Sequence, residues 1–116
     1  MKILGLKGES LAVRFLETKG YKILSKNYKT YVGEIDIIAQ DGETVVFIEV
    51  KTRTNDSFGY PFESVHRKKR RKLRDLALLY LKKQGKELPV RFDVLSIMFT
   101  ESGTKEIEHI KDAFEV

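Results

Sequence analysis

Apolar and polar residues alternate along residues 33–53, and this alternation predicts a β-hairpin. The pair Asp41-Gly42 separates two apolar-rich runs. Asp-Gly between such runs is a strong hairpin signal, because both turn positions favour a positive φ. A two-residue turn at this pair would place Asp36 opposite Phe47 and diagonal to Glu49.

The predicted hairpin has one apolar face and one polar face, since side chains alternate between the two sides of a strand. The apolar face carries Ile35, Ile37, Ala39, Val46, Ile48 and Val50. The other face gathers Glu34, Asp36, Glu49 and Lys51, together with Val45 and Phe47. These polar residues could simply line a solvated face. However, Asp and Glu are poor strand formers, and a carboxylate pair with a flanking lysine also suits a divalent cation such as Mg²⁺. The pattern alone leaves both interpretations open.

A first helix is predicted for residues 5–19, where apolar residues recur at helical spacing and Gly20 can cap the C-terminus. Glu9 would lie in the first turn or two of this helix. Its carboxylate could complement the positive end of the helix dipole. Alternatively, Glu9 could point over the sheet and join the acidic residues of the hairpin.

A second, longer helix is predicted from about residue 61 to Gln84, closed by Gly85. Its C-terminal half is amphipathic, with an apolar face formed by Leu73, Leu76, Ala77, Tyr80 and Leu81. Its N-terminal half contains six consecutive cations, Arg67, Lys68, Lys69, Arg70, Arg71 and Lys72. This run could be a solvated face or a nuclear-localisation signal. Cations near a helix N-terminus oppose the dipole, however, and this favours binding of phosphate groups.

The residue patterns of two further segments predict strands. Residues 21–25 suit a first strand, and Asn27 after them could contact a nucleic-acid backbone or lie on a sheet edge. Residues 90–99 are apolar on both faces, which is typical of a strand inside a sheet. Because strand–helix–strand units are parallel and right-handed, this strand should lie beside the second strand of the hairpin. Arg91 and Asp93 share one of its faces, where they could form an ion pair or Arg91 could reach a phosphate. The tail after Gly103 suits either a short strand or a closing helix.

Length and composition narrow the class of protein. The chain has 116 residues, which suits a single domain spanning 1–116 with one core. It contains no cysteine, which excludes thiolate metal sites, and its two histidines disfavour a zinc site. No apolar run approaches the roughly 18 residues that span a bilayer, so a soluble cytoplasmic protein without a membrane partner is expected. The net charge of +5 favours an anionic partner.

A series of motifs resembles one nuclease superfamily. The motifs are Gly8-Glu9, Asn27-Tyr28, Gly33-Glu34-Ile35-Asp36, Phe47-Ile48-Glu49-Val50-Lys51-Thr52-Arg53, Arg91-Phe92-Asp93 and Asp112-Ala113-Phe114. Their order resembles the PD-(D/E)XK nucleases and, more closely, the small bacterial YraN-like (UPF0102) family within them. Archaeal Holliday-junction resolvases look like distant relatives. Ile35 stands where the superfamily name has proline, a position that varies and does not touch the metal.

The resemblance implies an α/β fold with a restriction-endonuclease-like αβββαβ core, in which helices flank a mixed central sheet. It also implies a set of site residues. Asp36 and Glu49 would bind Mg²⁺ or Mn²⁺, with the Val50 backbone carbonyl as a further ligand and Glu9 completing the acidic cluster. Lys51 would orient or deprotonate the attacking water and offset charge in the transition state.

The implied function is that of a metal-dependent nuclease, with branched or otherwise structured DNA as one conceivable substrate. Nucleic acid, DNA rather than RNA, would contact Asn27, Arg53, Arg67, Lys68, Lys69, Arg70 and Arg71. A homodimer would supply two sites for cutting two strands. Two alternatives stay open. The chain could be a non-catalytic nucleic-acid-binding module that keeps the nuclease fold, or an interaction protein whose acidic face binds a basic partner.

Overall fold

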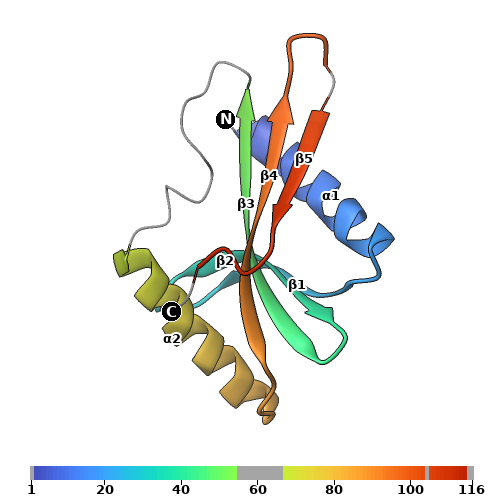
Figure 1. Ribbon diagram of the computed structural model, residues 1–116. Helices are drawn as coiled ribbons and strands as arrows, with labels where there is room; N and C mark the ends of the chain where they lie inside the picture. Colours follow the sequence, from blue (N-terminus) through green and yellow to red (C-terminus); the bar gives the residue numbers. More distant parts are fainter. Residues whose placement is uncertain (1, 55–66, 104, 115–116) are drawn as a thin grey trace.

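The computed structural model describes residues 2–54, 67–103 and 105–114, which form two helices and five strands (Figure 1). In chain order these elements are α1 (Lys2–Thr18), β1 (Lys22–Lys29), β2 (Glu34–Asp41), β3 (Thr44–Thr54), α2 (Arg67–Gln84), β4 (Val90–Phe99) and β5 (Lys105–Ile110). The first six follow the αβββαβ order expected from the sequence, and β5 adds one more strand. The predicted α/β fold class is therefore confirmed.

The strands form a single mixed sheet in the order β1-β2-β3-β4-β5. Antiparallel pairing joins β1, β2 and β3, whereas β3 and β4 are parallel, from Val45 opposite Val90 onward. β5 is antiparallel to β4, so the tail forms a strand and not a helix. β4 lies inside the sheet between β3 and β5, as the apolar character of both its faces predicts.

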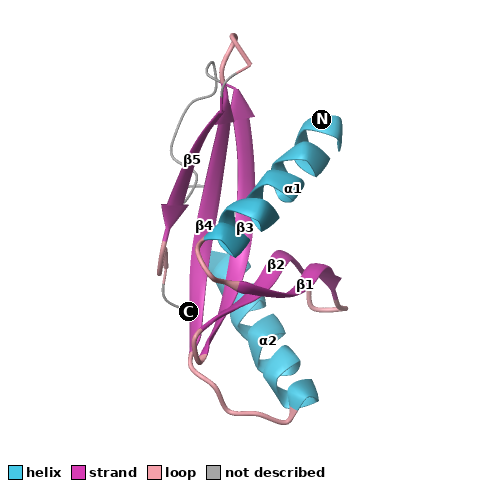
Figure 2. Ribbon diagram, turned by 90° about the vertical axis from the view of Figure 1, so that its right-hand side faces the viewer, coloured by secondary structure: helices cyan, strands magenta, loops and turns pink. Residues whose placement is uncertain are grey.

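The two helices cover opposite faces of the sheet (Figure 2). One core cluster joins α2 to the sheet, with Leu73 and Leu76 packed near Phe47. The other joins α1 to the sheet through Ala12 and Leu16. All but one of the apolar residues predicted for one face of the hairpin lie on the α1 side. These residues are Ile37, Ala39, Val46, Ile48 and Val50. The exception is Ile35, which packs in the α2 cluster because β2 has left the β3 ladder at that point.

The hairpin turn differs from the predicted one by its position. Asp41 pairs with Thr44, so the two turn residues are Gly42 and Glu43, and Gly42 has a φ of 61°. Asp41 stays in the strand, where its carboxylate accepts a contact from Arg91 (Nη1–Oδ2 3.2 Å). The prediction that Asp36 lies opposite Phe47 is therefore wrong, because Phe47 pairs with Ile38. The register changes by two residues, and a shift of two preserves which side chains share a face.

Both helices end at a glycine with a positive φ. At the end of α1, Gly20 has a φ of 88°, and Tyr21 donates its N–H to the Leu16 carbonyl at 3.0 Å. Gly85 has a φ of 67° and follows α2 in the same way, as predicted. The start of the second helix predicted near residue 61 lies outside the described residues. Among the described helices, none combines the length and apolar character needed to cross a membrane.

A glycine allows α1 to approach β3. A Cβ atom added at Gly8 would collide with the methyl group of Thr52 on β3. Only a residue without a side chain fits at this crossing. The crossing holds the next residue, Glu9, beside the sheet.

Candidate functional site

Asp36 lies on β2 at the point where β2 and β3 stop pairing. The last paired residues are Ile37 and Ile48. Beyond them, Val50 of β3 donates its N–H to the Asp36 carboxylate, with an N–Oδ2 distance of 2.7 Å. The side chain thus accepts a strand N–H that a backbone carbonyl would accept in a continuous ladder. This contact fixes the carboxylate between the two diverging strands.

The surroundings of Asp36 raise the pKa of its carboxyl group from 3.8 to about 6. Burial is the largest cause, because it disfavours the charged form. The negative charges of Glu49 and Glu9 raise the pKa further, whereas the Val50 N–H and the Lys51 ammonium lower it. A carboxylate that is both buried and close to other carboxylates is stabilised by a bound cation. Such a shift is typical of functional sites.

Glu49 lies on β3, and its side chain is only 11% exposed. Two ammonium groups contact the same carboxylate oxygen. Lys69 of α2 places its Nζ 2.6 Å from Oε1, and Lys51 of β3 places its Nζ 3.6 Å from Oε1. A buried carboxylate needs such partners, because burial of an unpaired charge is unfavourable. Glu49 and Lys51 therefore share one face of β3, as the alternation of the sequence predicts.

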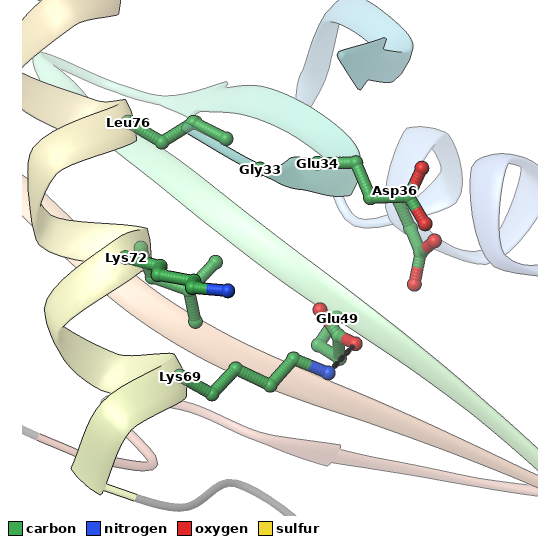
Figure 3. Close-up of a pocket in the computed structure, with 8 residues that line it drawn as sticks. Gly33, Glu34, Asp36, Glu49, Lys69, Lys72 and Leu76 are labelled. Carbon is green, nitrogen blue, oxygen red and sulfur yellow. Dashed lines mark hydrogen bonds and ion pairs between the residues drawn. The ribbon is translucent and has the colours of Figure 1, made fainter. Parts of the chain in front are cut away.

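Asp36, Glu49 and Lys69 line an open pocket of about 440 Å³ between α2 and the hairpin (Figure 3). Its lining consists of Gly33, Glu34, Asp36, Glu49, Lys69, Lys72, Leu73 and Leu76. Carboxylates come from the strands, and ammonium groups extend toward them from the helix (Figure 3). The structure thus brings Asp36 and Glu49 into one pocket. Lys72 is an additional candidate, and its spacing of three residues from Lys69 on a helix is the signal for it.

Glu9 lies on the other side of Asp36. It lines a second pocket of about 430 Å³, together with Asp36 and Asn27. The first turn of α1 contains no acidic residue, and Glu9 lies in the middle of this helix. The helix-dipole interpretation of Glu9 is therefore wrong, because the helix begins at Lys2 and not near residue 5. Its effect on the pKa of Asp36 supports the alternative, in which Glu9 adds to the acidic residues of the site.

Asn27 has an unusual backbone. Its φ is 51°, although it lies within β1, and a positive φ is uncommon for a residue other than glycine. It falls between the pairs that Lys26 and Tyr28 form with β2, and this places it across from Asp36. Backbone conformations of this kind concentrate at functional sites.

The cations of α2 do not all face the pocket. Lys69 and Lys72 line it, whereas Arg71 is exposed and Arg70 lies over the ring of Phe114, 5.3 Å from its centroid. The side chains of Arg67 and Lys68 are outside the described part of the chain. Arg53 is half-buried on β3, two residues beyond Lys51. The predicted contacts of these residues with nucleic acid stay predictions.

The chemistry of the pocket fits Mg²⁺ or Mn²⁺. Mg²⁺ is commonly held by one or two carboxylates, with waters and substrate phosphates as the other ligands. Asp36 and Glu49 are two such carboxylates. No group of three acidic or histidine side chains that could hold a metal occurs within the described ranges. A divalent cation here would therefore draw its remaining ligands from the backbone, water or substrate. The proposed part of the Val50 carbonyl stays a prediction.

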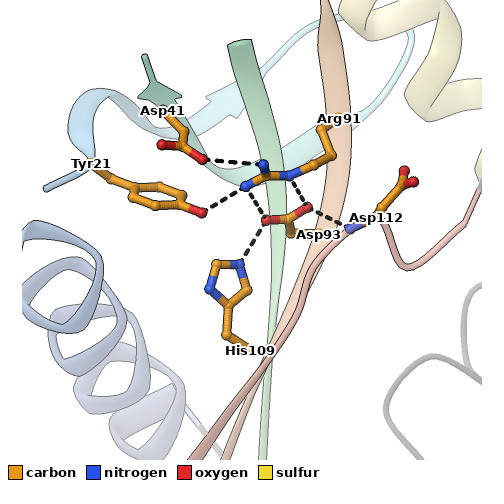
Figure 4. Close-up of polar contacts among 6 residues, drawn as sticks. All are labelled: Tyr21, Asp41, Arg91, Asp93, His109 and Asp112. Atoms are coloured by element: carbon orange, nitrogen blue, oxygen red, sulfur yellow. Dashed lines mark hydrogen bonds and ion pairs between the residues drawn. The ribbon is translucent and has the colours of Figure 1, made fainter. Parts of the chain in front are cut away.

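A second polar cluster lies near the start of β4 and serves the fold (Figure 4). Arg91 and Asp93 form a two-bond ion pair, at 2.9 and 3.0 Å, as one of the two sequence interpretations predicts. The same guanidinium contacts Tyr21 and Asp41. Asp93 is completely buried and also contacts His109 (Nε2–Oδ2 2.7 Å). Every nitrogen of the guanidinium is engaged within the protein, so this cluster joins β4 to the elements around it.

Fold and site together define an α/β protein with a lysine-flanked acidic pocket where two central strands diverge. The chain matches the model of the family described as "Uncharacterised protein family UPF0102" over residues 8–97. It belongs to this family.

Similar proteins cover nearly the whole chain. The UPF0102 protein of Thermodesulfovibrio yellowstonii is 55% identical over 111 residues, which are 96% of this chain and 95% of the relative. The UPF0102 protein of Geobacter metallireducens is 50% identical over 116 residues, covering 99% of this chain and 94% of the relative. That of Clostridioides difficile is 48% identical over 108 residues, or 92% of each chain. The names of these relatives state no activity.

Proposed function

We propose that this protein is a metal-dependent nuclease that hydrolyses phosphodiester bonds in DNA. The observation that carries the proposal is the shared pocket of Asp36 and Glu49, together with the contacts that Lys51 and Lys69 make with the Glu49 carboxylate. The resemblance of the motifs to PD-(D/E)XK nucleases supports it. The distant resemblance to archaeal Holliday-junction resolvases supports branched DNA as the substrate and a homodimer as the working form.

The two carboxylates and the lysines near them each have a defined part in the proposed reaction. Asp36 and Glu49 would hold Mg²⁺ or Mn²⁺, which when bound supplies positive charge and makes a water molecule more acidic. Lys51 extends from the same strand face as Glu49 and would position the attacking water. Its ammonium would also offset the negative charge that develops on the phosphorus centre. Lys69 and Lys72 would bind the phosphates of the backbone from the α2 side.

A cleavage screen tests the proposal. The protein is incubated with Mg²⁺ or Mn²⁺ and with duplex, single-stranded, flapped and four-way DNA. We expect metal-dependent cleavage that is lost in Glu49→Ala, while nucleic-acid binding is kept. Asp75→Ala is a matched control, because Asp75 is an exposed carboxylate on α2 that pairs with Arg74. Absence of cleavage of every substrate with either metal would contradict the proposal.

One observation favours a second candidate, a nucleic-acid-binding module without turnover. Lys69 already neutralises Glu49 at 2.6 Å, so the carboxylate has a partner without any metal. In that case DNA would bind equally well in EDTA and in Mg²⁺, and no substrate would be cleaved with either metal. Both candidates predict that Glu49→Ala keeps DNA binding, so the metal dependence of binding and the cleavage screen separate them.

A further inference from the structure

We propose that Lys69 is an exchangeable counter-ion, which pairs with Glu49 in the free protein and transfers to a DNA phosphate when a divalent cation binds. Lys69 is thus a positioning residue that couples two ligands, the metal and the nucleic acid. The inference rests on the proposed function and adds to it. Its consequence is that each ligand strengthens the binding of the other.

The geometry identifies Lys69 as the principal partner of Glu49. Its Nζ lies 2.6 Å from Oε1, a distance typical of a charge-assisted hydrogen bond, whereas the Nζ of Lys51 is 3.6 Å away. The carboxylate is nearly buried, so few water molecules can replace a departing ammonium. Lys69 therefore occupies the charge position that a cation bound to Glu49 would need.

A divalent cation and two ammonium groups cannot share one carboxylate oxygen, because their repulsion at contact distance is large. Lys69 is the group able to leave. It reaches the site from α2 on a flexible four-carbon side chain that is 37% exposed, and it faces an open pocket. Lys51 is less exposed, at 27%, and lies on the same strand as Glu49. Lys51 would therefore stay while Lys69 exchanges.

The pocket indicates where the released ammonium goes. Lys72, one turn further along α2, lines the same space, so Lys69 released from Glu49 would face another cation without a neutralising anion. A phosphodiester entering between them would neutralise both. Its oxygens could also complete the coordination of the cation, since the two carboxylates leave positions for other ligands. Metal and DNA would therefore bind with positive coupling, which is reciprocal by thermodynamic linkage.

Calorimetric titration of Mn²⁺ into the free protein tests the exchange. Lys69→Met removes the competing charge but keeps the length of the side chain. We expect this variant to bind Mn²⁺ about three- to tenfold more tightly than the wild type, as loss of a partly exposed ion pair suggests. Lys72→Met is the matched control, because it removes a charge from the same pocket without a contact to Glu49. Its Mn²⁺ affinity should change by less than about twofold.

Fluorescence anisotropy of a labelled four-way DNA, measured in EDTA and in Ca²⁺, tests the coupling. Ca²⁺ also prefers oxygen ligands. We expect Ca²⁺ to tighten DNA binding by the wild type and to do so by a smaller factor in Lys69→Met. Thermal melts monitored by circular dichroism establish that both variants are folded.

The outcomes distinguish this inference from the proposed function. Equal or weaker Mn²⁺ binding by Lys69→Met, with clear binding by the wild type, would overturn the exchange and leave the nuclease proposal intact. That result would mean that Lys69 only holds Glu49 in place. Absence of Mn²⁺ binding by both proteins, with and without DNA, would overturn both.

Discussion

Asp36 and Asp93 are two buried aspartates whose environments shift their pKa values in opposite directions. Burial would raise the pKa of Asp93, but hydrogen bonds from His109, Arg91 and the N–H of Asp112 lower it below the usual value. For Asp36, burial prevails and neighbouring carboxylates add to it, so its pKa rises to about 6. A buried carboxylate with saturated partners stabilises the fold. A buried carboxylate whose pKa is raised instead is typical of a functional site.

The raised pKa of Asp36 has a consequence for stability. Between pH 3.8 and about 6 the folded protein binds more protons at this residue than the unfolded chain. Its contribution to stability is therefore present at low pH and is lost as the pH rises through about 6. Above that pH the charged carboxylate lowers the free energy of unfolding.

We therefore expect Asp36→Asn to be more stable than the wild type in EDTA at pH 8. The amide can still accept the Val50 N–H but carries no charge, and the gain should be about 1 to 3 kcal/mol. The gain should disappear as the pH falls toward 4, where the wild-type carboxyl is protonated. Urea unfolding at pH 4, 6 and 8 measures it. Asp75→Asn, at an exposed position, should show no such gain; a similar change in both variants would contradict the explanation.

At the scale of elements, the strands and helices follow from local patterns, whereas their ends do not. The faces of the hairpin were predicted except at Ile35, although the turn position was wrong by one residue, because a register shift of two leaves the faces unchanged. Asp41 remains in its strand because of a contact with Arg91, 50 residues away in sequence. The tail forms β5 because β4 offers it an edge. Contacts of this kind between distant residues cannot be read from a local pattern.

Gly8 provides a prediction about how α1 is placed. We expect Gly8→Ala to destabilise the protein, although alanine favours helices, because its Cβ would collide with Thr52. The loss in the free energy of unfolding should be about 1 to 3 kcal/mol, as for other overpacked positions. Gly33→Ala is the matched control, since a Cβ there meets no atom within 4 Å.

Thermal and urea unfolding of the two glycine variants measure the difference. A Gly8→Ala protein as stable as the wild type would mean that α1 can move away from β3 without loss. The position of Glu9 relative to Asp36 would then not depend on this crossing.

At the scale of the whole molecule, the sequence predicts the carboxylates of the candidate site but not which basic side chains of α2 lie beside them. Strand alternation suffices to place Glu49 and Lys51 on one face. The six-residue basic run of α2 radiates around the helix, so its local pattern does not single out Lys69 and Lys72, which line the pocket. That choice depends on the rotation of α2, which is set by the packing of its apolar face on the sheet. Arg70 turns toward Phe114 for the same reason.

The rotation of α2 leads to a prediction that distinguishes DNA binding through the pocket lysines from DNA binding through the net charge of the protein. Lys69 and Lys72 near the start of α2, and Lys82 and Lys83 in its last turn, are pairs of the same residue type on the same helix. Replacing either pair by alanine lowers the net charge from +5 to +3, since each lysine contributes one charge. If the protein binds DNA through its overall field, the two double variants should weaken binding equally.

If the pocket binds the phosphate backbone of DNA, the two double variants should differ in the salt dependence of DNA binding. The slope of the logarithm of the affinity against that of the salt concentration should fall by about two units for Lys69→Ala/Lys72→Ala, one for each lost phosphate contact. Lys82→Ala/Lys83→Ala should keep nearly the wild-type slope. Anisotropy titrations of a labelled duplex at a fixed Ca²⁺ concentration and several concentrations of monovalent salt measure both, because Lys69 is expected to reach a phosphate only when a divalent cation is bound. Equal slopes for the two double variants would place the DNA away from the pocket. A phosphate bound in the pocket would lose its contacts with two cations, and the salt dependence of binding would therefore decrease.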